Sequence, residues 1–369
     1  MFYMGGIGLA AFLTLLLFSK QKKTQADWFL GFWLLLVTLH LLFFYLWKTG
    51  IYNWLGADMP LPLVHGPMLY MYAKALTGRS VSFKAILLHL LMPIGVLIYL
   101  IPFYLLPVEQ KFYVFQHNGE GYEAFNLFRI NANVVSGVLY IVLASLALRR
   151  HRQTIVQEFS TTDKINLQWL QYLTYWLAAI WVFVIIGDDY WVFGCSVMFV
   201  LFIGFFGIRQ VGIFHSLEEP EIITTKQPIA ASLIEVEKPK YSKSGLSDDA
   251  AEKLHRDLIH LIKSEKVYLN SELTLADLAI ALSTQPNYLS QVINEREKKN
   301  FYDFINTLRI EEFKHKAGQP GSEKFTLMGL AQECGFNSKS SFNRYFKKAT
   351  GQSPSEFLDL VSQRAKPAA

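Results

Sequence analysis

The chain has 369 residues, of which 52% are hydrophobic and 15% aromatic, and its mean hydropathy is +0.23. Ordinary soluble domains are less apolar, so the composition excludes a purely soluble chain and indicates a large membrane-embedded part. The formal net charge is +5, from 35 Lys and Arg against 30 Asp and Glu, and the apolar residues are concentrated before Arg209.

Seven apolar segments precede Arg209, and each is near the ~20 residues that a helix needs to cross a bilayer. Residues 1–209 are therefore expected to form a seven-helix transmembrane sensor. Phe2–Ser19 has no basic residue before it and no small-residue cleavage site after it, which favours a permanent span over a signal peptide. Three prolines interrupt Met59–Leu76, so a re-entrant or interfacial segment is the alternative there. The segments are Phe2–Ser19, Trp28–Trp47, Met59–Leu76, Ala85–Leu105, Asn131–Leu148, Leu167–Ile186 and Tyr190–Ile208.

Charge placement predicts the orientation of these spans. Loops of a multi-pass membrane protein that are rich in Lys and Arg lie in the cytoplasm. The rule places the N-terminus outside and the C-terminus in the cytoplasm. The loops expected inside hold Lys20, Lys22, Lys23, Lys74, Arg79, Lys84, Arg149, Arg150, Arg152 and Lys164. The loops expected outside hold only Lys48, Lys111 and Arg129, with Asp58, Glu109, Glu120, Glu123, Asp188 and Asp189.

Ionisable side chains within the predicted spans are few, and such groups often mark functional sites. His65 precedes a Gly-Pro pair, where proline frees a backbone carbonyl and glycine permits close approach. The outer loop 107–131 carries Glu120 and Glu123, which a signal outside the membrane could contact. These three residues are the candidates for sensing a signal. The alternative for His65 is that it only satisfies a neighbouring polar group.

Residues 210–245 are predicted to be a flexible linker. They contain Pro220, Pro228 and Pro239, mixed charges and no helical periodicity. A flexible chain of about 35 residues has an end-to-end distance of roughly 30 Å. The following domain would stay near the inner leaflet unless proteolysis released it.

A helix-turn-helix pattern occupies residues 274–294. Thr274 and Asp277 have the spacing of a capping pair ahead of apolar residues at helical spacing. Pro286 fits the first position of a second helix, where its missing N–H needs no partner. Four uncharged polar residues then fall at i, i+3, i+4 and i+7 and are predicted to share one exposed face. They are Asn287, Ser290, Gln291 and Asn294.

A second copy of this pattern occupies residues 326–349. Thr326 caps its first helix, Gly335 supplies a left-handed turn residue, and Asn337 or Ser338 can cap the next helix. A connecting helix over 300–317, about 27 Å long, would let both copies reach neighbouring segments of one major groove. The polar face recurs in the second copy as Ser340, Asn343, Arg344 and Lys347.

The second helix of a helix-turn-helix unit lies in the DNA major groove, where Asn and Gln can pair with adenine and Arg with guanine. Lys347 and Lys348 are better placed for phosphates, which add affinity without sequence information, and Asn294 completes the first face. A solvated helix face is the alternative for one stripe, but two matched stripes favour DNA binding. The candidates for base contact are Asn287, Ser290, Gln291, Lys339, Ser340, Asn343 and Arg344.

Leu246–Leu360 resembles the DNA-binding domain of AraC-type transcriptional regulators. The run GFNSKSSFNRYFKKATGQSPSEF from Gly335 to Phe357 carries the resemblance, with a Gly-Phe turn, a Phe-x-Arg-x-Phe-Lys core and a Gly-x-Ser-Pro terminator in order. The first copy departs from the family pattern at Ser283, where members often have Gly, and at Gln291, where a basic residue is common. The resemblance implies a bacterial transcription factor with a separate sensor domain ahead of its DNA-binding domain.

The expected fold class is all-α, with a seven-helix transmembrane bundle, the linker and a cytoplasmic AraC-type double helix-turn-helix domain over 246–369. The expected function is regulation of transcription from the bacterial inner membrane; a transporter or enzyme with a regulatory tail is the alternative. Expected partners are double-stranded DNA, membrane lipid, a small-molecule or protein signal and a second copy of the chain. No catalytic residue, metal or cofactor is predicted, because no motif for one occurs in the sequence.

Overall fold

The computed structural model describes residues 2–162, 165–186, 189–213, 246–321 and 324–365. These residues form helices joined by turns, and no strand occurs among them, so the all-α prediction is confirmed for this part of the chain. They belong to two compact units. One unit comprises Met1–His151 and Leu167–Ile222, and the other comprises Arg152–Asn166 and Ile223–Ala369.

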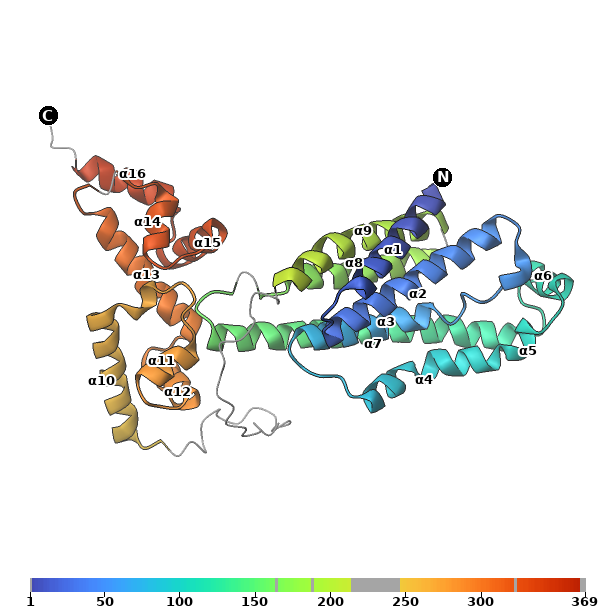
Figure 1. Ribbon diagram of the computed structural model, residues 1–369, viewed down its shortest axis with the longest axis horizontal. Helices are drawn as coiled ribbons and strands as arrows, with labels where there is room; N and C mark the ends of the chain where they lie inside the picture. Colours follow the sequence, from blue (N-terminus) through green and yellow to red (C-terminus); the bar gives the residue numbers. More distant parts are fainter. Residues whose placement is uncertain (1, 163–164, 187–188, 214–245, 322–323, 366–369) are drawn as a thin grey trace. The chain divides into compact units, whose positions relative to one another are not determined.

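The first unit consists of long apolar helices, and a helix overlaps each of the predicted spans (Figure 1). The helices are α1 (Phe2–Ser19), α2 (Gln25–Lys48), α3 (Pro62–Leu76), α4 (Phe83–Tyr99), α5 (Ile101–Tyr104), α6 (Val108–Gln116), α7 (Glu123–Glu158), α8 (Gln168–Ile186) and α9 (Asp189–Ile213). The fourth predicted span is divided between α4 and α5. Within the described ranges, two helices, α2 and α7, are long and apolar enough to cross a membrane. The seven-span bundle therefore stays a prediction.

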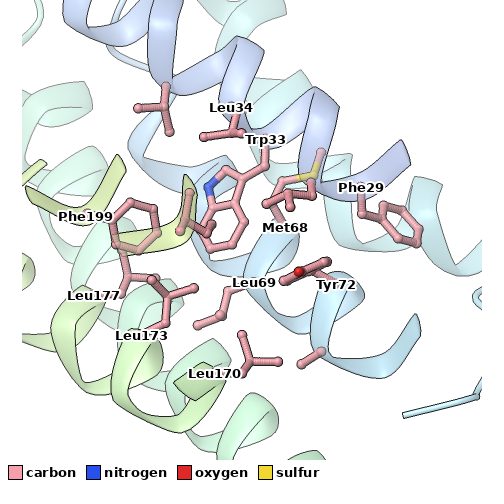
Figure 2. Packing of buried hydrophobic residues seen from close by; sticks show 14 of the residues in the cluster. Phe29, Trp33, Leu34, Met68, Leu69, Tyr72, Leu170, Leu173, Leu177 and Phe199 are labelled. Carbon is pink, nitrogen blue, oxygen red and sulfur yellow. The ribbon is translucent and has the colours of Figure 1, made fainter. Parts of the chain in front are cut away.

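The largest core of the first unit lies between α1, α2, α3, α7, α8 and α9, and Figure 2 shows its centre. Trp33 of α2 is 1% exposed and packs edge to face against Phe199 of α9, with ring centroids 5.3 Å apart. Met68 and Tyr72 of α3 approach from a second side, and Leu173 of α8 from a third. Close packing of these side chains gives van der Waals attraction that holds the helices together as one body.

The second unit is built around α13 (Figure 1), and two hydrophobic cores share this helix. The first half of α13, including Phe301 and Ile305, packs with α11 and α12, and Phe313 in the second half packs with α14 and α15. The connecting helix predicted for 300–317 is confirmed, and Asn300 caps it. The helices are α10 (Asp248–Glu265), α11 (Leu275–Ala281), α12 (Pro286–Arg296), α13 (Phe301–Ala317), α14 (Leu327–Glu333), α15 (Lys339–Thr350) and α16 (Pro354–Ala365).

The compact units differ from the predicted domain boundaries at two places. Arg152–Asn166, expected to be an inner loop of the membrane half, packs with the C-terminal helices. Hydropathy cannot reveal this, because the contacts join distant residues: Ser160 bonds to Leu273, 113 positions away. Residues 210–213, expected to begin the linker, continue α9 as helix, and the rest of the predicted linker, 214–245, lies outside the described residues.

Candidate nucleic-acid interface

The first helix-turn-helix unit consists of α11 and α12. Its start is the predicted capping box: the Asp277 N–H donates to the Thr274 hydroxyl (3.1 Å), and the Thr274 N–H donates to the Asp277 carboxylate (2.9 Å). These bonds satisfy N–H groups that have no partner inside the helix. The turn after α11 passes through Ser283 with a φ of 51°. This left-handed conformation costs a residue with a side chain about 1–2 kcal/mol.

The polar face of α12 is less open than its sequence pattern predicts. Asn287 is exposed, but Ser290 and Asn294 are half-buried. Gln291 is 7% exposed and donates to the Glu295 carboxylate at 3.2 Å. The reason is that the packed side of α12 is wider than its apolar stripe and includes Gln291 beside its buried neighbours. Asn287 is therefore the most solvent-accessible of the four predicted DNA contacts on α12.

The second helix-turn-helix unit consists of α14 and α15, and hydroxyl groups cap both helices. The Thr326 hydroxyl accepts from the Gly329 N–H at 3.0 Å, and the Ser338 hydroxyl accepts from the Ser341 N–H at 3.1 Å. Ser338 is thus the N-terminal cap of the second helix. Between the helices Gly335 has a φ of 90°, a conformation that favours glycine because it has no Cβ.

The outward face of α15 carries the predicted basic and polar stripe. Phe342 and Phe346 are fully buried on the opposite side of the helix and hold this face outward. The Arg344 guanidinium also donates to the Ser341 hydroxyl at 3.5 Å, which biases its position. Of the stripe, Asn343 is half-buried, and Ser340, Arg344 and Lys347 are exposed, as is the neighbouring Lys339.

Lys348, predicted to contact phosphate, forms an ion pair within the domain. Its Nζ lies 2.9 Å from the Asp303 carboxylate of α13. The Lys348 side chain is 65% exposed, and ion pairs at such sites contribute about 0–1 kcal/mol. A DNA phosphate can therefore replace the carboxylate at little cost. No Asp or Glu occurs in Lys339–Lys348, so α15 carries a local positive charge. Binding of DNA phosphates to this charge is expected to weaken as salt concentration rises.

A buried polar centre joins α13 to the segment that precedes α11. Arg309 is 0% exposed and donates to the carbonyl oxygens of Tyr268 and Asn270, each at 2.7 Å. Burial lowers the pKa of Arg309 to about 10, so the guanidinium stays charged at neutral pH. The Glu312 carboxylate accepts a hydrogen bond from the Lys266 Nζ at 2.9 Å. Burial alone would raise the pKa of Glu312, but the hydrogen bonds from Lys266 and Tyr268 and the nearby lysine charges outweigh burial and lower this pKa. This centre fixes the loop before α11 against α13.

Known proteins resemble this region of the chain. A family model described as a helix-turn-helix domain matches residues 278–359. A protein named as an uncharacterized HTH-type transcriptional regulator from Staphylococcus aureus (strain COL) is 29% identical over 92 residues, which are 25% of this chain and 12% of that protein. The uncharacterized HTH-type transcriptional regulator YijO from Escherichia coli (strain K12) is 32% identical over 87 residues, which are 24% of this chain and 30% of YijO.

The C-terminal region is an AraC-type helix-turn-helix domain. The resemblance carried by the run from Gly335 to Phe357 is thereby confirmed. This chain spans less than a third of the length of either relative, so the similarity concerns the AraC-type domain alone. No solved structure matches the chain.

Two buried residues that hold the AraC-type domain together, Arg309 and Ser160, were not predicted from the sequence. Arg309 lies on the apolar face of α13, four positions after Ile305 and four before Phe313, and a charge at such a position is a signal that sequence inspection can detect. Ser160 is 1% exposed and accepts hydrogen bonds from Arg309 and Asn306. No local pattern predicts this role, because Ser160 lies in a short polar turn far away in sequence.

Of the predicted signal-sensing residues, His65 lines a cavity in the first unit. The cavity has a volume of about 310 Å³, and its wall is mostly aromatic and aliphatic. Trp33 Nε1 donates to His65 Nδ1 at 3.2 Å, and His65 Nε2 lies 3.0 Å from His40 Nδ1. Because Trp can only donate, neutral His65 carries its proton on Nε2 and donates to His40. The polar side chains of the wall are His40, Asp58, His65, Arg129 and Ser196.

Glu120 and Glu123 do not line this cavity. Both are exposed in and after the turn between α6 and α7. Glu123 accepts from the Gly121 N–H at 2.9 Å, and a hydrogen bond with Glu120 raises the pKa of Tyr113. The three predicted sensing residues are therefore not brought together. Within the described ranges, no group of three or more His, Cys, Asp or Glu side chains is placed to hold a metal ion.

Proposed function

We propose that this protein is a membrane-anchored bacterial regulator of transcription, whose AraC-type domain binds specific DNA in response to a signal received by the helical N-terminal half. The observation that carries the DNA-binding part is α15, which presents Lys339, Ser340, Arg344 and Lys347 outward from a domain of a DNA-binding family. The α12 and α15 helices would enter successive segments of the major groove, with α13 as the spacer.

Apolar exposure supports the membrane part of this proposal. The α4 helix leaves Leu88, Leu91 and Ile98 exposed along its length. In water such a row of apolar side chains is unfavourable, whereas lipid tails accommodate it. This exposed apolar row and the length of α2 and α7 support a membrane-embedded N-terminal half. The excess of basic residues in alternate loops favours seven spans with the C-terminal domain in the cytoplasm.

Reporter fusions test this topology. A green fluorescent protein fused after Ala369 is expected to be fluorescent, and alkaline phosphatase at the same position is expected to be inactive, because the C-terminus lies in the cytoplasm. Fusions after Asn118, in the loop expected outside, serve as the matched control and should give the opposite pair of results. Active phosphatase after Ala369 would contradict the proposal, since the DNA-binding domain would then lie away from the chromosome.

The cavity lined by His65 is the site we assign to a small-molecule signal. It combines an apolar wall with polar groups of both charges, Asp58 and Arg129. The Arg129 Nε is buried and has no hydrogen-bond partner, and a buried donor without a partner is unfavourable unless a ligand or water accepts from it. These features suit a small molecule with an apolar body and an acceptor group. Glu120 and Glu123 are retained as candidate contacts for a signal outside the membrane.

Replacing His65 with Ala is expected to abolish the signal response while leaving basal DNA binding intact. The change interrupts the chain of hydrogen bonds from Trp33 to His40 at the cavity wall. The measurement is the output of a reporter promoter across growth conditions that change it in the wild type. His89→Ala is the control, because His89 bonds to Tyr140 and does not line this cavity. An unchanged response in His65→Ala would remove His65 from the sensing site.

A further inference from the structure

The segment after α7 docks along the loop that precedes α11. Phe159 pairs with Thr274 as a single antiparallel backbone bridge. The Ser160 N–H and the Ser160 hydroxyl both donate to the Leu273 carbonyl, at 3.2 and 2.6 Å. The Thr161 hydroxyl donates to the Ser271 carbonyl at 2.8 Å. This stretch therefore binds the AraC-type domain through its backbone as well as its side chains.

Ser160 is the anchor of this contact. Its carbonyl accepts from Asn306 Nδ2 at 2.9 Å and from Arg309 Nη1 at 3.2 Å, and its hydroxyl accepts from Arg309 Nη2 at 3.0 Å. Each polar atom of Ser160 thus has a partner although the residue is almost fully buried. Buried polar groups that are all satisfied mark a specific interface, since an unmatched one would be strongly unfavourable.

One turn before this anchor, the end of α7 contacts the predicted DNA-reading face of α12. The Gln157 Oε1 accepts from Asn294 Nδ2 at 3.3 Å and from the Ser290 hydroxyl at 3.5 Å. Ser290 and Asn294 are one helical turn apart on the same face. A major groove about 12 Å wide admits one α-helix. The α12 helix cannot insert into DNA on this face while the last turn of α7 lies against it.

We propose that Gln157–Thr162 is a latch: docked on the AraC-type domain, it covers the reading face of α12, and its release frees α12 for DNA. This inference rests on the function proposed above and specifies its regulation. The anchor at Ser160 supplies most of the contact, whereas the bonds of Gln157 are long and therefore weak. Arg129 of the cavity wall and Gln157 belong to the same helix, α7, which gives a bound signal a route to the latch.

Weakening the latch is expected to tighten DNA binding. The full chain in lipid nanodiscs is titrated with a duplex that the wild type selects from random sequence. Ser160→Ala removes two hydroxyl bonds of the anchor and should raise affinity about three- to tenfold. Gln157→Ala removes only the weaker contact with α12 and should raise affinity by less. Gln153→Ala is the matched control and should leave affinity unchanged, because Gln153 is exposed one turn earlier on α7.

Locking the latch gives the opposite test. A short bismaleimide links Gln157→Cys to Asn294→Cys in a chain whose Cys195 is replaced with Ser, while Cys334 is fully buried. The linked protein should bind the duplex at least tenfold more weakly than the same protein without the reagent. If the wild type binds the duplex but the linked form and both Ala variants bind equally well, the latch is overturned and the proposed function stands. If the wild type selects no duplex, both fail.

Discussion

Replacing Gly335 with Ala is expected to destabilise the second helix-turn-helix unit by about 3 kcal/mol or more. Gly335 has a φ of 90°, and a Cβ there would meet the carbonyl oxygens of Tyr268 and Leu269 at 2.7 and 2.9 Å. It would also meet Arg309 Nε at 2.8 Å. These atoms cannot move away easily, because Arg309 holds the Tyr268 carbonyl in place.

Hydrogen exchange of the full chain measures this effect. Amides of α14 and α15 should exchange about 100-fold faster in Gly335→Ala, since every 1.4 kcal/mol of opening free energy corresponds to a factor of ten. Gly351→Ala is the control: its φ is 79°, but a Cβ there meets nothing within 4 Å. It should cost only the roughly 1–2 kcal/mol of a left-handed residue. Equal effects of the two substitutions would contradict the close approach at Gly335.

The helices and caps of the AraC-type domain follow from local sequence, and this is why they were predictable. The capping box of Thr274 and Asp277 joins residues three positions apart, and the turn at Gly335 needs a residue type that the sequence shows directly. The first turn is different, because Ser283 adopts a φ of 51° that a side chain disfavours. Members of the family often have Gly at this position, which shows that the turn needs a left-handed residue. In this chain Ser283 adopts that conformation in place of glycine.

The burial and pairing of side chains at the candidate interface were not predictable, because they depend on contacts between residues far apart in the chain. Helical periodicity places Gln291 on a polar face but does not show that this side of α12 is packed. Local charge makes Lys348 a candidate phosphate contact but does not reveal Asp303 as its partner. The contact of Gln157 with Asn294 spans 137 residues. Periodicity identifies which side chains share a face, whereas burial and pairing are set by tertiary structure.

Replacing Arg344 with Ala is expected to weaken specific DNA binding by about 1–3 kcal/mol and to relax sequence preference at one base pair. Arg344 is exposed on α15, about one turn before the phosphate candidates Lys347 and Lys348. In the major groove its guanidinium can donate two hydrogen bonds to one guanine, and Ala can donate none. The measurement is the affinity of the full chain for a selected duplex and for its single-base variants.

Two further substitutions separate base reading from simple charge loss. Lys347→Ala should weaken binding to all sequences alike and reduce the salt dependence by about one phosphate contact. Arg256→Ala removes an equal charge from α10, where Arg256 is exposed and pairs with Glu252, and should leave binding nearly unchanged. If Arg344→Ala instead lowers affinity uniformly and changes the salt slope as Lys347→Ala does, Arg344 contacts phosphate. The reading of bases by α15 would then have to come from Lys339, Ser340 or Asn343.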